Sequence, residues 1–207
     1  MYKLYYKNGS CSLAIHALLN ELGQPVELIN AASVKDYKET VNAAGSVPVL
    51  DDNGTLVREG AAIALYLLEK HKSDMLPTEE PARTNAIQWL MFANASVHPS
   101  YSKIFFSASA IKDEAAKEQA MQAAADGVSA AWAVVDAQLA KTKYVTGDKP
   151  SAADFMLTIY ANWGVTHFPQ LKITFGENVK RLLKDISSRP SYQKALELEH
   201  VEYKAAA

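Results

Sequence analysis

The chain has 207 residues, of which 49% are hydrophobic and 21% charged, and its formal net charge is −2. This composition is typical of a globular protein and excludes a disordered chain. Without a basic field we expect no nucleic-acid partner. Because no apolar stretch approaches the roughly 18 residues that cross a bilayer, we expect no membrane partner either.

The cysteine count restricts the covalent chemistry and the compartment. Cys11 is the only cysteine, and residues 1–6 read as a strand that no signal-peptide core follows. An intrachain disulfide and a cysteine-based metal cluster are excluded, and no other paired metal ligands stand out, so we expect no metal. These features favour the reducing cytoplasm.

The first third of the chain alternates between strand and helix patterns. In chain order, these patterns predict a strand over 2–7, a helix over 10–22, a strand over 26–30, a short helix within 33–45, strands over 47–50 and 55–57, and a helix over 59–70. The Asn-Gly pair between the last two strands predicts a tight hairpin. The order β-α-β-α-β-β-α is the thioredoxin-like arrangement.

The rest of the chain reads as helical. From Pro81 onward, apolar residues recur with a 3.6-residue period, and no strand pattern is convincing. Residues 151–154 predict a capping box in which Asp replaces the usual Glu. We therefore expect a thioredoxin-like domain over 1–75, a linker over 72–82 and an all-helical domain over 83–207.

Cys11 is the first candidate for chemistry. It stands at the start of the first predicted helix, directly after a strand and a glycine turn. Free N–H groups and the positive end of the helix dipole favour a thiolate there, which predicts a lowered pKa. The alternative is a buried, inert cysteine, and position alone does not separate the two.

Val47 and Pro48 form the second candidate. In thioredoxin-like folds, a proline at this point in the chain is cis and faces the nucleophile loop. The Val47 backbone would then be free to pair with an extended peptide, as in strand addition. The alternative is an ordinary trans turn proline, which would be the better choice for an isolated Val-Pro pair.

Glu59 and Gly60 open the third predicted helix, whose N-terminus is suited to an anion. Glycine allows a carboxylate to approach the backbone, and Glu59 is able to accept from an ammonium group. The pair therefore suits the α-amino acid end of a ligand. The alternative is a glutamate that only complements the helix dipole.

His98 is the fourth candidate. It lies on the apolar stripe of a long predicted helix, one turn after Asn94, and Pro99 should kink the helix there. Polar groups on a buried stripe at a kink indicate a cleft wall, whereas the alternative is a satisfied core histidine. Nearby aromatic residues fit either an apolar pocket or plain core packing, with core packing the default.

Together, these segments resemble the bacterial beta class of glutathione transferases. The resemblance is carried in order by residues 4–13, 42–50, 59–67, Trp89 with His98, 147–154 and 189–196, and it covers essentially the whole chain. It implies the two-domain glutathione transferase fold, with an N-terminal thioredoxin-like domain and a C-terminal all-α domain.

The resemblance also implies a site and a reaction. Glutathione, as co-substrate, would lie along the cleft with its cysteinyl part on Val47 and Pro48 and its γ-glutamyl end on Glu59 and Gly60. Its sulfur would sit near Cys11 and His98, the two expected catalytic residues. The implied partners are a small hydrophobic electrophile, as in detoxification, and a second copy of the chain in a homodimer.

The sequence departs from the family pattern at the other end of the ligand. The segment between the second strand and Asn42 is short, and a lysine that often meets the glycyl carboxylate falls in that gap. Lys35 is the candidate replacement. Met91 and Pro99 replace an asparagine and a lysine that are common in the family.

The resulting hypothesis is a glutathione S-transferase that transfers alkyl or aryl groups to the glutathione sulfur, with a second hypothesis of glutathione-dependent disulfide reduction. The rival is a non-catalytic protein of the same fold that binds apolar ligands or a partner. A related isomerase or dehalogenase would share glutathione and differ in its second substrate.

Overall fold

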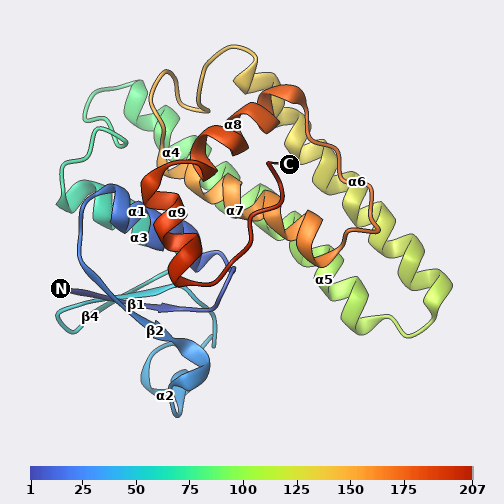
Figure 1. The fold of residues 1–207 in the computed structure, drawn as a ribbon, viewed down its shortest axis with the longest axis horizontal. Coiled ribbons are helices and arrows are strands. Elements are labelled where there is room, and N and C mark those ends of the chain that lie inside the picture. The colour runs from blue at the N-terminus through green and yellow to red at the C-terminus, as the bar shows by residue number, and fades with distance from the viewer. Residues whose placement is uncertain (207) are drawn as a thin grey trace.

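The structure is a computed structural model that describes residues 1–206. Figure 1 shows a small sheet with its helices formed by the first part of the chain, and a larger group of helices formed by the rest. The thioredoxin-like and all-helical halves expected from the sequence are both present.

The sheet has four strands in the order β2-β1-β3-β4. The strands are β1 (Tyr2–Tyr6), β2 (Val26–Asn30), β3 (Val49–Asp52) and β4 (Thr55–Arg58). Strand β1 runs parallel to β2 and antiparallel to β3, which pairs antiparallel with β4. Leu4 lies opposite both Leu28 and Leu50, and Leu50 lies opposite Val57, so these four side chains share one face.

The predicted hairpin is confirmed between β3 and β4. Asn53 and Gly54 form its two-residue turn, and both have a positive φ, at 53° and 94°. Asparagine and glycine tolerate this conformation better than other residues, which is why the pair marks such turns in a sequence.

The helices of the first half are α1 (Ser12–Glu21), the 3₁₀ turn η1 (Ala31–Ser33), the single-turn helix α2 (Tyr37–Thr40) and α3 (Gly60–Lys70). Leu13 of α1 and Ile63 of α3 are fully buried in the core that also contains Leu4 and Leu50. The apolar face of the sheet therefore packs on α1 and α3, and this packing fixes where both helices begin.

The second half consists of helices within the described residues. They are α4 (Ala82–Phe92), the π-helical segment η2 (Ala93–Val97), α5 (His98–Ala110), α6 (Glu114–Leu139), α7 (Ala152–His167), α8 (Glu177–Ser187) and α9 (Pro190–Leu198). Residues 152–164 of α7 are buried without a break, so α7 is the central helix. Between α3 and α4, residues 71–81 form the connection.

The predicted capping box is present at the start of α7. The Ser151 N–H and hydroxyl both donate to the Asp154 carboxylate at 2.7 Å, and the Val145 N–H donates to its other oxygen at 3.1 Å. Burial raises the pKa of Asp154 to about 6, although these hydrogen bonds oppose the increase. The cap therefore ties the loop before α7 to the helix itself.

The predicted irregularity near Pro99 is present in a different form. The helix departs from α-helical geometry over η2, directly before His98, and Pro99 lies in the first turn of α5. Proline is tolerated in a first turn because its missing N–H is not needed there.

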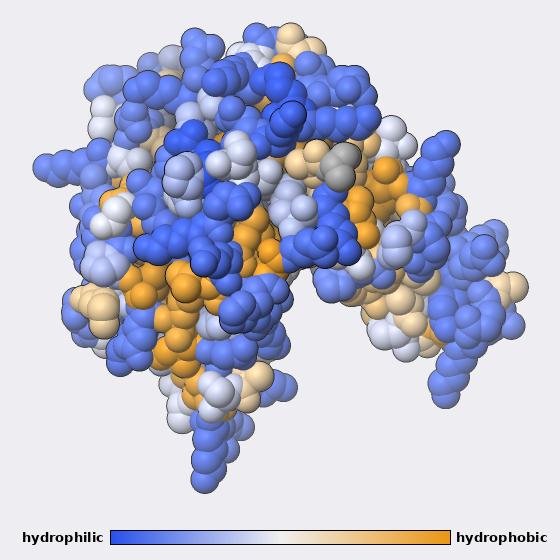
Figure 2. All heavy atoms as spheres, in the orientation of Figure 1, coloured by the Kyte–Doolittle hydropathy of each residue, from blue (hydrophilic) through white to orange (hydrophobic). Residues whose placement is uncertain are grey.

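Helix α1 lies between the two halves, because it packs against α9 and α7 as well as against the sheet. In Figure 2, the molecular outline is notched between the sheet domain and the protruding ends of α5 and α6, and hydrophobic side chains border the notch. None of the described helices combines the length and apolar character that crossing a membrane requires.

Candidate functional site

Cys11 occupies the N-cap position of α1, in the loop that leaves β1. Its Sγ donates a hydrogen bond to the backbone carbonyl of Val47 at 3.3 Å. Ser12, the first residue of α1, bonds back to Lys7 through both N–H···O and O–H···O contacts at 3.3 Å. The end of β1 and the start of α1 thus hold the thiol against the segment before β3.

The predicted lowering of the Cys11 pKa is wrong. Burial raises the pKa of the thiol to about 11, and the Glu59 and Glu199 carboxylates add to the increase. Hydrogen bonds from backbone N–H groups at the start of α1 lower it, as the helix N-terminus leads one to expect. Desolvation is the larger effect, so the thiol is neutral and available as a hydrogen-bond donor at neutral pH.

Val47 and Pro48 face Cys11 across the cavity. The Val47–Pro48 peptide bond is cis, as the thioredoxin-like arrangement implied, and the alternative of a trans turn proline is wrong. Asn42 supports Ser46, the residue before Val47, because the Asn42 side-chain N–H donates to the Ser46 carbonyl at 2.9 Å. The segment that carries the Val47 backbone is therefore held in place by its own short-range contacts.

Glu59 and Gly60 form the N-terminus of α3 beside this segment. Glu59 has a φ of 70°, which a residue with a side chain adopts at a cost of order 1–3 kcal/mol. A methyl group at Gly60 would lie 3.5 Å from the terminal carbon of Met156 and 3.7 Å from the side-chain oxygen of Asn94. The glycine thus keeps open the space between α3 and the helical domain.

His98 enters from the helical domain at the start of α5. Its ring stacks on Tyr160, with centroids 5.0 Å apart and an interplanar angle of 9°, and lies 5.1 Å from the ring of Trp163. Burial lowers the pKa of His98, and the Glu59 carboxylate partly opposes this. The imidazole is therefore neutral at pH 7.

One cavity of about 180 Å³ brings most of these candidates together. Its lining consists of Cys11, Ser46, Val47, Pro48, Glu59, Gly60, Asn94, His98, Met156 and Tyr160. Every predicted site residue except Lys35 is present, and so is Asn94, which the sequence placed on a cleft wall. Lys35 is exposed and does not line the cavity.

Three lining residues carried no signal in the sequence. Ser46 could have been noted as the neighbour of Val47. Met156 and Tyr160 lie on α7, where consecutive residues are buried and leave no periodic pattern to read.

A larger cavity of about 580 Å³ is lined by residues of α3, the connection and α4, including Leu68 and Arg83, and no predicted site residue lines it.

His16 of α1 lies outside the cavity, in the interface between the two halves of the chain. It is fully buried, and its Nδ1 lies 3.1 Å from a carboxylate oxygen of Glu199, which is also fully buried. Glu199 had no signal in the sequence. The pair joins α1 to the chain just after α9.

A thiol at the N-terminus of a helix, a facing cis-proline and a histidine from the helical domain thus line one cavity of a thioredoxin-like fold. Comparisons with known proteins agree with this fold. The family model described as Glutathione S-transferase, N-terminal domain matches residues 4–78, and that described as Glutathione S-transferase, C-terminal domain matches residues 97–190.

Sequence similarity to individual relatives covers most of the chain. Glutathione S-transferase GST-4.5 of Xanthomonas campestris pv. campestris is 32% identical over 167 residues, which are 78% of this chain and 81% of that protein. The chain belongs to the glutathione S-transferase family.

Solved structures agree on the fold. The bacterial beta class glutathione S-transferase of Sphingomonas chungbukensis superposes with a TM-score of 0.81 at 26% identity, covering 97% of this chain and 100% of that one. A sphingomonad glutathione S-transferase complexed with glutathione superposes with a TM-score of 0.79 at 28% identity, with the same coverage.

Proposed function

We propose that the protein conjugates glutathione to hydrophobic electrophiles, with glutathione as co-substrate. The main observation behind this proposal is that one cavity is lined by Cys11, Val47, Glu59, Gly60 and His98. The sequence spreads these residues over four segments and two domains, and a shared cavity is the arrangement that a thiol peptide would need. The similarity to a glutathione S-transferase complexed with glutathione supports the choice of ligand.

In this proposal, the peptide lies extended across the cavity. Its cysteinyl part pairs with the Val47 backbone, and its γ-glutamyl group meets Glu59 and the N-terminus of α3 at Gly60. A cavity of about 180 Å³ accommodates only the middle of such a peptide, so its ends lie in more open parts of the cleft. The glycyl carboxylate has Lys35 as its proposed partner, reached by movement of that exposed side chain.

The chemistry follows from the protonation states. Cys11 is a neutral thiol, so its S–H would turn from the Val47 carbonyl and donate a hydrogen bond to the glutathione thiolate, and the N–H groups at the start of α1 would add positive potential. The glutathione thiol loses its proton to water. Its sulfur forms a bond to the electrophilic carbon, and the leaving group departs with the bonding pair. His98, neutral at pH 7, would hydrogen-bond the sulfur or the leaving group.

An aromatic wall favours flat, apolar electrophiles. Beyond His98, the ring of Phe105 lies 6.4 Å from that of Trp163 and 4.8 Å from that of Phe168. Phe105 is exposed to 40%, and Trp163 connects its ring with that of His98. This exposed ring would offer edge and face contacts to an aromatic substrate.

Disulfide reduction is the second proposed activity. The Cys11 thiolate would attack the glutathionyl sulfur of a mixed disulfide and release the other thiol. A second glutathione thiolate would then attack the enzyme-bound disulfide, release oxidised glutathione and regenerate Cys11. The raised pKa of Cys11 makes its thiolate scarce at neutral pH, so this activity should be the slower of the two.

The proposal also includes a homodimeric assembly and a cytoplasmic location. The family resemblance supports a two-fold homodimer in which the sheet domain of one subunit meets the helical domain of the other. A single free cysteine is compatible with the reducing cytoplasm as the working compartment. In each subunit, residues 1–75 would form the glutathione-binding domain and residues 83–207 the helical domain.

The test measures binding and turnover separately. Isothermal titration with glutathione should show one site per chain, and an aromatic electrophile with an absorbance change should be consumed only when glutathione and protein are both present. Binding without turnover of a panel of electrophiles would favour the non-catalytic alternative. Absence of glutathione binding would overturn the proposal.

A further inference from the structure

The backbone of Gly9, two residues before Cys11, is held at both its N–H and its carbonyl by the C-terminal half of the chain. The indole N–H of Trp163 donates to the Gly9 carbonyl at 2.8 Å. The Gly9 N–H donates to a carboxylate oxygen of Glu199 at 3.3 Å. Gly9 has a φ of 66°, so this turn is one that glycine makes readily.

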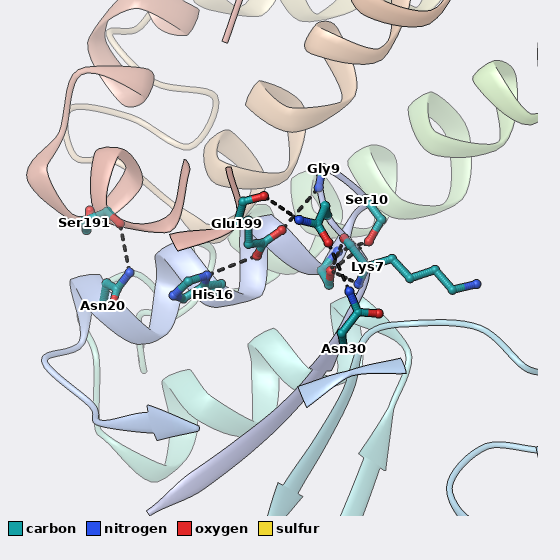
Figure 3. A network of polar contacts seen from close by, with 10 residues as sticks. Lys7, Gly9, Ser10, His16, Asn20, Asn30, Ser191 and Glu199 are labelled. Carbon is teal, nitrogen blue, oxygen red and sulfur yellow. Dashed lines mark hydrogen bonds and ion pairs between the residues drawn. The ribbon is translucent and has the colours of Figure 1, made fainter. Parts of the chain in front are cut away.

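Glu199 is itself fixed by its neighbours (Figure 3). Its other carboxylate oxygen meets His16 Nδ1 at 3.1 Å, and its backbone carbonyl accepts from the Asn8 side chain at 2.7 Å. A fully buried carboxylate without partners would be strongly unfavourable, so these contacts define its position. Glu199 thereby holds the chain on both sides of Cys11, at Asn8 and Gly9 before it and at His16 after it.

Trp163 also contacts two residues of the helical domain that line the cavity. Its ring centroid lies 5.1 Å from that of His98 and 4.9 Å from that of Tyr160, both of which line the cavity. It also meets Tyr101 edge-on, with the centroids 5.8 Å apart. The Trp163 side chain therefore makes two kinds of contact. Its N–H bonds the loop that carries the Cys11 thiol, and its ring packs against His98 and Tyr160.

We propose that Trp163 is a positioning residue that sets the depth of the Cys11 thiol in the cavity relative to His98. The Trp163–Gly9 bond draws the loop toward the helical domain, and Glu199 holds the N–H of the same residue. The cysteine is then presented at a fixed distance from the wall on which the second substrate lies. The effect on kcat rests on the proposed conjugation, whereas the positioning of the Cys11 thiol does not.

The test replaces the indole by apolar side chains that cannot donate a hydrogen bond, in Trp163→Phe and Trp163→Leu. Without the bond to Gly9 the loop loosens, so Cys11 should react with iodoacetamide about tenfold faster at pH 8. In conjugation, kcat should fall about tenfold while the KM for glutathione stays near the wild-type value, because Val47, Glu59 and Gly60 are unchanged.

Two matched variants separate positioning from general destabilisation. Trp132→Phe also removes a buried indole hydrogen bond, the 2.9 Å contact with the Tyr101 hydroxyl, but does not touch the Gly9 loop. Trp89→Phe changes a tryptophan that is 8% exposed, as Trp163 is. Both should alkylate Cys11 at the wild-type rate.

Two Trp163 variants are used because one of them could fail to fold. Thermal melting followed by circular dichroism would reveal such a failure. If a folded Trp163 variant alkylates Cys11 at the wild-type rate and keeps the wild-type kcat, the proposal is overturned. The alkylation result stands even if the wild type conjugates no electrophile, so failure of the proposed function would be recognised separately.

Discussion

The Cys11 thiol points at the Val47 carbonyl oxygen and donates to it across 3.3 Å, so the cysteine and the cis-proline segment are in direct contact. A buried donor with a carbonyl partner is stabilised in its protonated form, and burial raises the pKa of this thiol to about 11. This relationship decides how the site can use its only cysteine.

The first prediction concerns that thiol. Alkylation by iodoacetamide, followed across pH, should show an inflection well above the value of about 8.5 for a free thiol and near 11. Free glutathione treated in parallel calibrates the assay. An inflection below that of free glutathione would show that the helix N-terminus outweighs burial, in contradiction to the structure.

The second prediction separates the two activities of Cys11. The change Cys11→Ser keeps a hydrogen-bond donor but removes the capacity to form a disulfide. Conjugation of an aromatic electrophile should therefore be reduced but present, whereas reduction of a mixed disulfide of glutathione should be lost. Steady-state kinetics with both substrates would measure this, and undiminished activity in both assays would remove Cys11 from the mechanism.

The third prediction concerns His98. Because burial lowers its pKa, kcat/KM for conjugation should fall on the acid side with an inflection below the ordinary histidine value of about 6.5. In His98→Gln this inflection should disappear and the rate should drop about tenfold. His200→Gln is the control, since His200 is exposed and does not line the cavity. An acid limb that persists in His98→Gln would assign it to another group.

The fourth prediction tests the buried cap of α7. Burial raises the pKa of Asp154 to about 6. Between about pH 4 and pH 6 the unfolded carboxyl loses its proton while the folded one keeps it, so the contribution of Asp154 to stability falls as pH rises. The difference in free energy of unfolding between wild type and Asp154→Asn should shrink by roughly 3 kcal/mol over this range and stay level above it.

Urea denaturation at several pH values measures this difference directly, because the other titrating groups are common to both proteins. A difference that grows with pH would mean that the hydrogen bonds from Ser151 and Val145 outweigh the cost of burying the charge.

The fifth prediction is the assembly state. Sedimentation equilibrium at micromolar concentration should give about twice the chain mass of 22.6 kDa. Repeating the run at several concentrations separates a stable dimer from a weak one. A mass near that of one chain throughout would contradict the proposed homodimer.

The parts of the fold that local chemistry specifies were predictable. The hairpin follows from Asn53 and Gly54, and the cap of α7 follows from Ser151 and Asp154, because each depends on residues close in sequence. The sequence also grouped Cys11, the cis-proline segment, the start of α3 and His98 through family resemblance.

Features that depend on distant contacts were not predictable. His16 and Glu199 are 183 residues apart, and neither residue alone indicates the other. Tyr160 lies in a continuous buried run, which leaves no pattern to mark its cavity-facing role. The Cys11 pKa depends on how completely the folded chain covers the thiol, and the helix N-terminus gives only the opposing effect.

The partners of the Cys11 loop have a consequence for biosynthesis. Trp163 and Glu199 come from the last quarter of the chain, so a ribosome that has released the whole sheet domain has not yet made either of them. During that interval the Gly9 peptide has only water as its partner, and the thiol loop is not fixed by the contacts of the finished protein. The active geometry is therefore completed only when the final helix has been translated and has docked on α1.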